Sequence, residues 1–406
     1  MTVALSRRAS DVRVIGLISL AHGSSHFFHL ILPPMFPWLR DAFALSYAEL
    51  GLLMSVFFVV SCVAQAASGF LVDRIGARPV LFGGVGLLVL AALVYSQSNG
   101  YAMLLLGAVI AGCGNGIFHP VDYTLINHKV SPPNLPYAYS MHGVTGYLGW
   151  AAAPAFMVGI AQLADWRVAF MLAGVLEALI LLVLWLNRNQ LIDNVKERHV
   201  SAQAANSGGA HESPFAFLRL PAVWLCWVFF FFSMASTSSL QSFAPSALFS
   251  IYEIPLNVGS YYITLLALGS AGGVLFGGYL AAKLQAPERI VSTCLSITVL
   301  MCLLLATGFI SINLIPIIFF ALGFGYGVVA PSRDLLVKKA TPQGVAGRVY
   351  GIVYSGIDLG AAVGPFIFGF FMDAGLPKAL FLGIVVFQLM IIPTVFQVKS
   401  KSRQAA

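Results

Sequence analysis

Two short sets of polar residues stand at helical spacing inside apolar stretches of this chain. Intervals of four and then three separate His22, His26 and His29, and the same intervals separate Asn115, His119 and Asp122. Residues three and four apart lie on one face of a helix, so each set predicts a polar stripe. Imidazole titrates near neutral pH and often ligates metals, and a carboxylate can take a proton or a cation.

Three interpretations of these stripes are open. The side chains can join helices by hydrogen bonds, or they can bind a substrate or a proton. They can also hold a metal ion, with nitrogens from His22, His26 and His119 and oxygen from Asp122. His142 adds a further imidazole in a neighbouring apolar stretch, which favours a binding role for the group.

The second half of the chain supplies other polar residues to apolar stretches, namely Gln241, Arg333 and Asp358. Ionisable groups are costly in a bilayer, so they usually face a cavity or a partner. Arg333 can bind an anionic group of a solute, or it can form a salt bridge with Asp122 or Asp334. Asp358 can carry a proton or cation, or bond to a backbone neighbour.

The elements that position these residues are membrane helices. Hydrophobic residues make up 59% of the 406 and charged residues 9%, against about 45–50% and about 25% in soluble proteins. Apolar runs of about 20 residues suit helices that cross the bilayer. We predict twelve spans, at about residues 14–38, 47–72, 79–97, 101–128, 138–163, 166–187, 220–249, 256–282, 288–309, 312–338, 346–371 and 376–397.

The positive charges fall on one side of these spans. Every Lys and Arg except Arg40, Arg167 and Lys378 lies on the side that both termini share. This bias predicts a multi-pass protein of the cytoplasmic (inner) membrane with both termini in the cytoplasm. The net charge of +7 is thereby explained without nucleic acid.

A repeat relates the two halves of the chain. At one constant offset, Gly112, Gly114, Gly116, Pro120, Gly149 and Pro154 correspond to Gly323, Gly325, Gly327, Pro331, Gly360 and Pro365. The polar residues differ, since His119 corresponds to Ala330 and Asp122 to Arg333. We expect two pseudo-symmetric six-helix bundles, residues 1–187 and 220–406, joined by a flexible cytoplasmic linker at 188–219.

The loop after the second span carries the pattern G-x-x-x-D-R-x-G-x-R, formed by Gly69, Asp73, Arg74, Gly76 and Arg78. We expect Gly69 to allow close helix packing and Gly76 to allow a tight turn. The pattern resembles the cytoplasmic loop signature of the major facilitator superfamily, and with the repeat the resemblance covers essentially the whole chain. It implies that the first, fourth, seventh and tenth helices line a central cavity, and that these loop residues form a gate in which Asp73 meets the helix start at 346–349.

A narrower resemblance concerns helices one and four. His119-Pro120 with Asp122, and Ser25-His26-Phe27, are similar to elements of the fosmidomycin-resistance branch of that superfamily. In that branch the acid usually follows the proline directly, whereas here Val121 intervenes.

Together these observations predict an all-α integral membrane protein with the major facilitator fold. We expect a proton-coupled secondary transporter of a small anionic organic solute or drug that works by alternating access, with export or uptake, and antiport or symport, left open. The alternative is a transporter of a metal ion or metal chelate, and after it a non-transporting membrane sensor. We expect no enzyme and no cofactor, a monomer, and contacts only with the bilayer and the small-molecule substrate.

Overall fold

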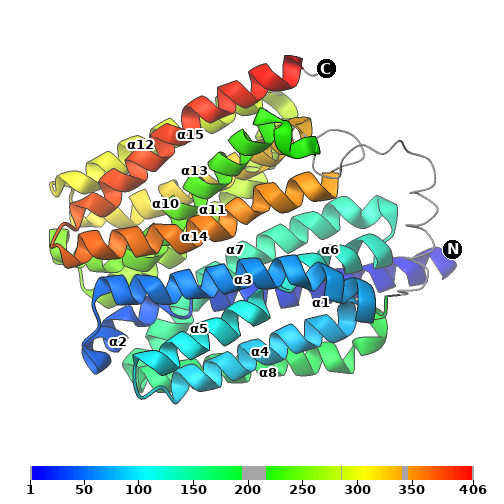
Figure 1. Cartoon of the computed structure of the whole chain (residues 1–406), viewed down its shortest axis with the longest axis horizontal. Coiled ribbons are helices and arrows are strands. Elements are labelled where there is room, and N and C mark those ends of the chain that lie inside the picture. The colour runs from blue at the N-terminus through cyan, green and yellow to red at the C-terminus, as the bar shows by residue number, and fades with distance from the viewer. Residues whose placement is uncertain (1, 194–215, 285, 341–345, 405–406) are drawn as a thin grey trace. The chain divides into compact units, whose positions relative to one another are not determined.

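The computed structural model describes residues 2–193, 216–284, 286–340 and 346–404, which fold mainly into helices (Figure 1). Among these residues, twelve helical stretches are long and apolar enough to cross a membrane, as the sequence predicted. The chain forms two compact units. The first unit comprises Met1–His29, Val60–Gly149 and Arg167–Pro214. The second unit comprises Leu30–Val59, Trp150–Trp166 and Phe215–Ala406.

The first unit holds both polar stripes. Its helices are α1 (Thr2–His29), the later part of α3 (Tyr47–Ile75), α4 (Ala77–Ser96), α5 (Tyr101–Asn115), α6 (Phe118–Lys129), the early part of α7 (Leu135–Leu163) and α8 (Trp166–Leu186). Within it α1 packs against α6, and α4 packs against α5 and α6.

The second unit contains the remaining helices. They are α2 (Phe36–Phe43), the early part of α3, the later part of α7, α10 (Pro221–Tyr252), α11 (Leu256–Leu284), α12 (Pro287–Thr307), α13 (Ile315–Ala340), α14 (Ala346–Asp373) and α15 (Lys378–Gln404). Short 3-10 turns include Arg188–Leu191 and Ala216–Arg219 at the two ends of the predicted linker. Residues 194–215 between them lie outside the described residues.

The first predicted span is interrupted. We expected one helix over about residues 14–38, but α1 ends at His29, and a 3-10 turn at Pro33–Met35 leads into α2. Pro33 and Pro34 lack amide protons and clash with the carbonyl one turn earlier, and this pair of adjacent prolines favours the end of the helix. The histidine stripe therefore occupies the last turns of α1.

The fourth span is interrupted as well. Its helix was expected to continue from about 101 to 128, but α5 ends at Asn115 and α6 begins at Phe118. Pro120 cannot donate to the carbonyl of Gly116, which loosens the chain one turn before the proline. Gly116 also packs closely, since a methyl group there would lie 2.5 Å from the Ser61 carbonyl oxygen.

Glycines bring α14 against α10, and these helices run side by side in Figure 1. A methyl group at Gly356 would lie 2.8 Å from the Trp227 carbonyl oxygen, and one at Gly364 would lie 2.5 Å from that of Ala235. Small residues at these steps allow the two backbones to touch. The glycines of α14 therefore allow this close contact with α10.

The structure agrees with the prediction for Gly76 in the loop after the second span, but not with the prediction for Gly69. Gly76 has φ 92°, in the left-handed region that favours glycine, so the expected tight turn is confirmed. A methyl group at Gly69, in contrast, would meet no atom within 4 Å in the described structure. The prediction that Gly69 allows close helix packing is therefore wrong for this structure.

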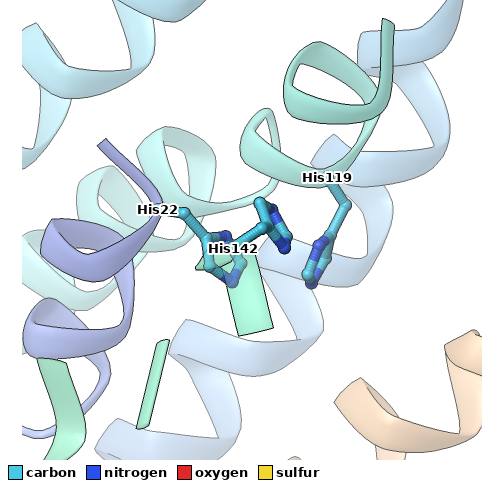
Figure 2. Close-up of side chains that lie close together, drawn as sticks. All are labelled: His22, His119 and His142. Carbon is cyan, nitrogen blue, oxygen red and sulfur yellow. The ribbon is translucent and has the colours of Figure 1, made fainter. Parts of the chain in front are cut away.

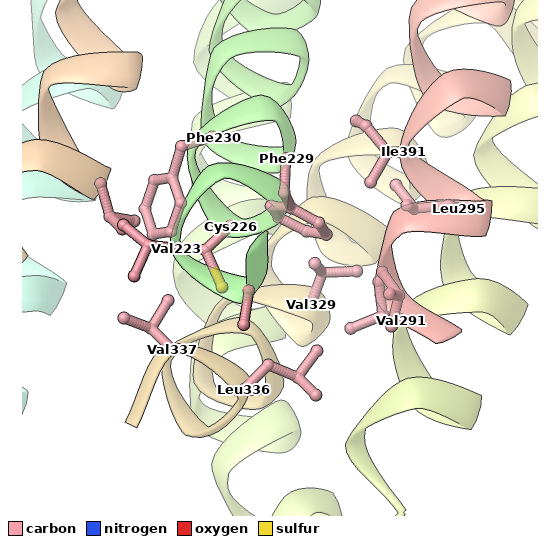
Figure 3. Close-up of a cluster of buried hydrophobic side chains, with 13 residues drawn as sticks. Val223, Cys226, Phe229, Phe230, Val291, Leu295, Val329, Leu336, Val337 and Ile391 are labelled. Atoms are coloured by element: carbon pink, nitrogen blue, oxygen red, sulfur yellow. The ribbon is translucent and has the colours of Figure 1, made fainter. Parts of the chain in front are cut away.

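An apolar core fills the second unit between α10, α12, α13 and α15 (Figure 3). It includes Val223, Cys226, Phe229 and Phe230 on α10, Val291 and Leu295 on α12, Val329, Leu336 and Val337 on α13, and Ile391 on α15. Burial of these side chains fixes the segment of α13 that carries Arg333.

Candidate functional site

Three helices of the first unit bring imidazole rings together. His22 comes from α1, His119 from α6 and His142 from α7, and Figure 2 shows the three rings gathered at one place. The rings of His22 and His142 stack with centroids 3.4 Å apart, and the centroid of His119 lies 5.4 Å from that of His22. His22 and His142 are buried, and His119 is half-buried.

Asp122 lies at the centre of this cluster and is completely buried. Its Oδ2 atom lies 3.2 Å from Nδ1 of His22 and 3.1 Å from Nε2 of His142, both within hydrogen-bonding distance. Its Oδ1 atom has no hydrogen-bond partner among the described residues. One carboxylate therefore holds imidazoles from two other helices, which makes the site a tertiary assembly of α1, α6 and α7.

The other predicted polar residues of this unit extend the cluster. The His26 ring lies 4.5 Å from that of His22 and 4.8 Å from that of His29. His29 Nε2 lies 2.8 Å from Oδ1 of Asn115, and Asn115 donates from Nδ2 to Ser61 Oγ at 2.8 Å. The two stripes predicted from sequence thus face each other across α1, α5 and α6.

Glycine on α7 makes room for the rings. A methyl group at Gly146 would lie 2.9 Å from His26 Nδ1 and 3.2 Å from His22 Nε2. At Gly149 it would overlap the Gly23 carbonyl oxygen of α1. The absence of side chains at these two positions lets α7 approach α1, so that His142 reaches the cluster.

The geometry can hold a cation. His22, His119 and His142 each offer one ligand atom, and these atoms all lie within 4.8 Å of one another. The set differs from the predicted one, because His142 enters, whereas His26 and Asp122 do not. Sequence alone could not select His142, which lies on a different helix from either stripe.

The remaining predicted site residues belong to the second unit. Arg333 donates from Nε to Oδ1 of Asp334 at 3.0 Å, and its guanidinium lies 4.4 Å from the centre of the Phe230 ring. Of the alternatives for Arg333, the pairing with Asp334 is present. Gln241 is buried on α10, and Asp358 is half-buried inside the span Ile352–Asp373 of α14.

The predicted cytoplasmic gate is described only in part. The side chain of Asp73 and the helix start at 346–349 lie outside the described side chains, Arg74 is exposed and Arg78 is half-buried. The backbone amide of Ala77, which begins α4, donates to both carboxylate oxygens of Asp193 at 3.0 and 3.1 Å. Sequence reasoning missed Asp193, because its partner is far away in the chain.

A second helix start is also capped by a distant acid that we did not predict. The amides of Tyr47 and Ala48, at the beginning of α3, donate to Oδ1 and Oδ2 of Asp373 at 2.7 and 2.8 Å. Ser55, two turns further along α3, donates to the Ala362 carbonyl of α14 at 2.6 Å. Within the second unit these bonds hold the beginning of α3 against the later part of α14.

Comparison with known proteins agrees with this architecture. The family model of the Major Facilitator Superfamily matches residues 18–365 and 286–403. A bacterial homolog of the human lysosomal transporter Spinster has the same fold, with a TM-score of 0.77, 14% identity and coverage of 97% of this chain and 98% of that chain. The chain belongs to the Major Facilitator Superfamily, and it is a membrane transporter, not an enzyme.

Two relatives from Escherichia coli (strain K12) indicate the range of similar proteins. The 3-(3-hydroxy-phenyl)propionate transporter is 26% identical over 87% of this chain and 87% of its own. The fosmidomycin resistance protein is 24% identical over 42% of each chain. The expected resemblance to that second protein is therefore present over less than half of the chain, within a broader similarity to transporters of the superfamily.

Proposed function

We propose that this protein is a proton-coupled secondary transporter of a small anionic organic solute that works by alternating access. The observation that carries the coupling is Asp358, a half-buried carboxyl inside the span Ile352–Asp373. An acid at this depth is expensive for the bundle to keep charged, so it gains from taking up a proton in one part of the cycle.

Arg333 supports an anionic solute. Guanidinium stays charged and binds carboxylates through paired hydrogen bonds. Here it lies over the Phe230 ring, and its Nε atom bonds to Asp334, whose side chain is 46% exposed. A solute carboxylate that replaces Asp334 would gain an aromatic surface as well as the charge, a combination suited to aromatic acids. The hydroxyphenylpropionate transporter among the relatives is named for such an acid.

We place the protein in the cytoplasmic membrane as a monomer with both termini in the cytoplasm. The support for this orientation is the distribution of Lys and Arg, which lie on the side of the termini except for Arg40, Arg167 and Lys378. Labelling of a cysteine placed near either terminus in sealed cells tests it, since an impermeant reagent should not react there.

The coupling is tested in proteoliposomes with an imposed pH gradient. In wild-type protein the gradient should drive accumulation of a carboxylate identified by thermal stabilisation of the purified protein, starting with 3-(3-hydroxyphenyl)propionate and other aryl and sugar acids. Asp358→Asn should abolish gradient-driven accumulation but keep exchange of solute across the membrane. Glu253→Gln, which changes an exposed acid, is the control. Gradient-driven accumulation that survives in Asp358→Asn would show that this carboxyl does not couple transport.

The anionic character is tested with matched ligands. Each stabilising acid is compared with its primary amide, which has nearly the same shape and no charge. We expect the acid to bind and the amide to fail, and Arg333→Gln to remove most of the difference. Equal binding of acid and amide would contradict the proposal.

A further inference from the structure

The cluster of His22, His119, His142 and Asp122 has more hydrogen-bond acceptors than donors. A neutral imidazole has one donor and one acceptor nitrogen, and an ionised carboxylate accepts only. Two of the ring donors are used by Oδ2 of Asp122. Oδ1 of Asp122 and Nδ1 of His119 are buried without a hydrogen-bond partner among the described residues. Such a site gains most from a ligand that brings positive charge and accepts lone pairs.

We propose that this cluster binds a divalent transition-metal ion of the zinc type, through one nitrogen each of His22, His119 and His142. Imidazole is the ligand that zinc, cobalt and nickel share, and three histidines with an open fourth position form a familiar zinc arrangement. The inference goes beyond the proposed transport of an organic anion and does not depend on it.

The distances favour such an ion. Zinc–nitrogen bonds of about 2.0–2.1 Å place the ligand atoms of a tetrahedral site about 3.4 Å apart. One nitrogen from each of the three rings lies within 4.8 Å of the others, so only a small shift toward a common centre is needed to close the site. His119 is the half-buried member, which gives it the freedom for this movement, whereas His22 and His142 are fixed by Asp122.

Asp122 positions two of these ligands. Histidines that bind metals usually donate their other ring N–H to a carboxylate, which fixes the tautomer and turns the opposite nitrogen toward the metal. With Nδ1 of His22 and Nε2 of His142 donating to Oδ2 of Asp122, the opposite nitrogens carry the lone pairs. The buried carboxylate also offsets part of the charge of the ion. Asp122 is therefore a positioning residue of the site.

Cobalt provides a direct test on the purified full-length protein in detergent. His199 and His211, which lie outside the described residues, are first replaced by Ala so that they cannot contribute ligands. After treatment with a chelator, Co²⁺ is titrated and its visible absorption recorded. We expect one equivalent to bind with the intense absorption of a four-coordinate site, and Zn²⁺ to displace it.

Single substitutions identify which side chains bind the ion. His119→Ala and His142→Gln should each weaken binding at least tenfold, and Asp122→Asn about 10–100-fold, the usual effect of losing a carboxylate that orients ligands. His128→Ala is the matched control, because His128 is an exposed histidine on the same helix as His119 and should leave binding unchanged. Each variant must elute as wild type in size exclusion, so that weak binding reflects the site and not unfolding.

Absence of the cobalt absorption in wild-type protein, or wild-type affinity in His119→Ala, would overturn the metal site. Because the measurement involves no transport, the result is separate from the proposed function. A protein that binds Co²⁺ here yet fails to accumulate any carboxylate would contradict the proposed function alone.

Discussion

The contact between Asp373 and the start of α3 leads to a quantitative prediction. Asp373 is the last residue of α14, where its own helix dipole disfavours a negative charge. The amides of Tyr47 and Ala48 offset this cost by donating to the carboxylate at 2.7 and 2.8 Å. The carboxylate is therefore more favourable in this place while the beginning of α3 lies against α14. In a transporter that alternates between states, such a contact stabilises the state in which these two helix ends touch.

We predict that Asp373→Ala favours separation of these ends by about fivefold. Loss of an N-cap acceptor costs about 0.5–2 kcal/mol, and the exposure of Asp373 places the effect at about 1 kcal/mol. With tenfold for every 1.4 kcal/mol, this corresponds to about a fivefold change in the equilibrium. Asp373→Asn keeps one acceptor oxygen and should have a smaller effect.

Cysteine labelling measures the change. In a background without the five native cysteines, Ser55→Cys places a thiol where Ser55 now bonds to the Ala362 carbonyl. Reaction of purified protein with a water-soluble maleimide should be about five times faster when Asp373→Ala is added, because the thiol reacts while the helices are apart. Asp41→Ala removes another exposed acid, on the helix just before α3, and should leave the rate unchanged. The same labelling rate with and without Asp373 would refute the reasoning.

Two further predictions concern the first unit. Gly149→Ala should destabilise the protein by about 1–3 kcal/mol and lower its Tm in detergent, because the new methyl group overlaps the Gly23 carbonyl. Gly143→Ala is the control on the same helix, since a methyl group there meets no atom within 4 Å and should leave the Tm unchanged. Equal Tm values for the two variants would contradict this packing. Asn115→Ala should lower the free energy of unfolding by about 1–3 kcal/mol, because the hydrogen bonds to His29 and Ser61 are lost. The control is Asn99→Ala, which changes an exposed asparagine. If both variants melt alike, these hydrogen bonds contribute little to stability.

Much of the fold could be predicted because it depends on local properties. Hydropathy over about 20 residues located the twelve spans among the described residues. Helical spacing placed His22 and His26 on one face, and the structure shows their rings in contact. Errors occurred where proline changed the backbone, as at Pro33 and Pro34, where the expected helix ends early. Hydropathy does not register these breaks, because proline and its neighbours are apolar enough to pass as part of a span.

The composition of the site could be predicted only in part. The sequence identified the imidazoles and Asp122 as unusual, since polar groups in apolar spans are costly. It could not say which of them lie close enough to bind one ion, and the predicted set contained His26 and Asp122 where the structure groups His142 with His22 and His119. Asp373 carried no signal at all, because an acid that follows a span resembles any other surface charge.

The sequence by itself determined that this is a membrane protein built of repeated helices with acid–base groups inside its spans. These conclusions follow from composition, spacing and the offset between matching glycines and prolines, all of which are properties of the chain before it folds. Only the tertiary structure decided that Asp122 joins His22 of α1 to His142 of α7, and that Asp373 caps α3. The reason is physical: these contacts depend on how closely helices approach, which is set by the packing of glycines such as Gly149 against backbones distant in the sequence.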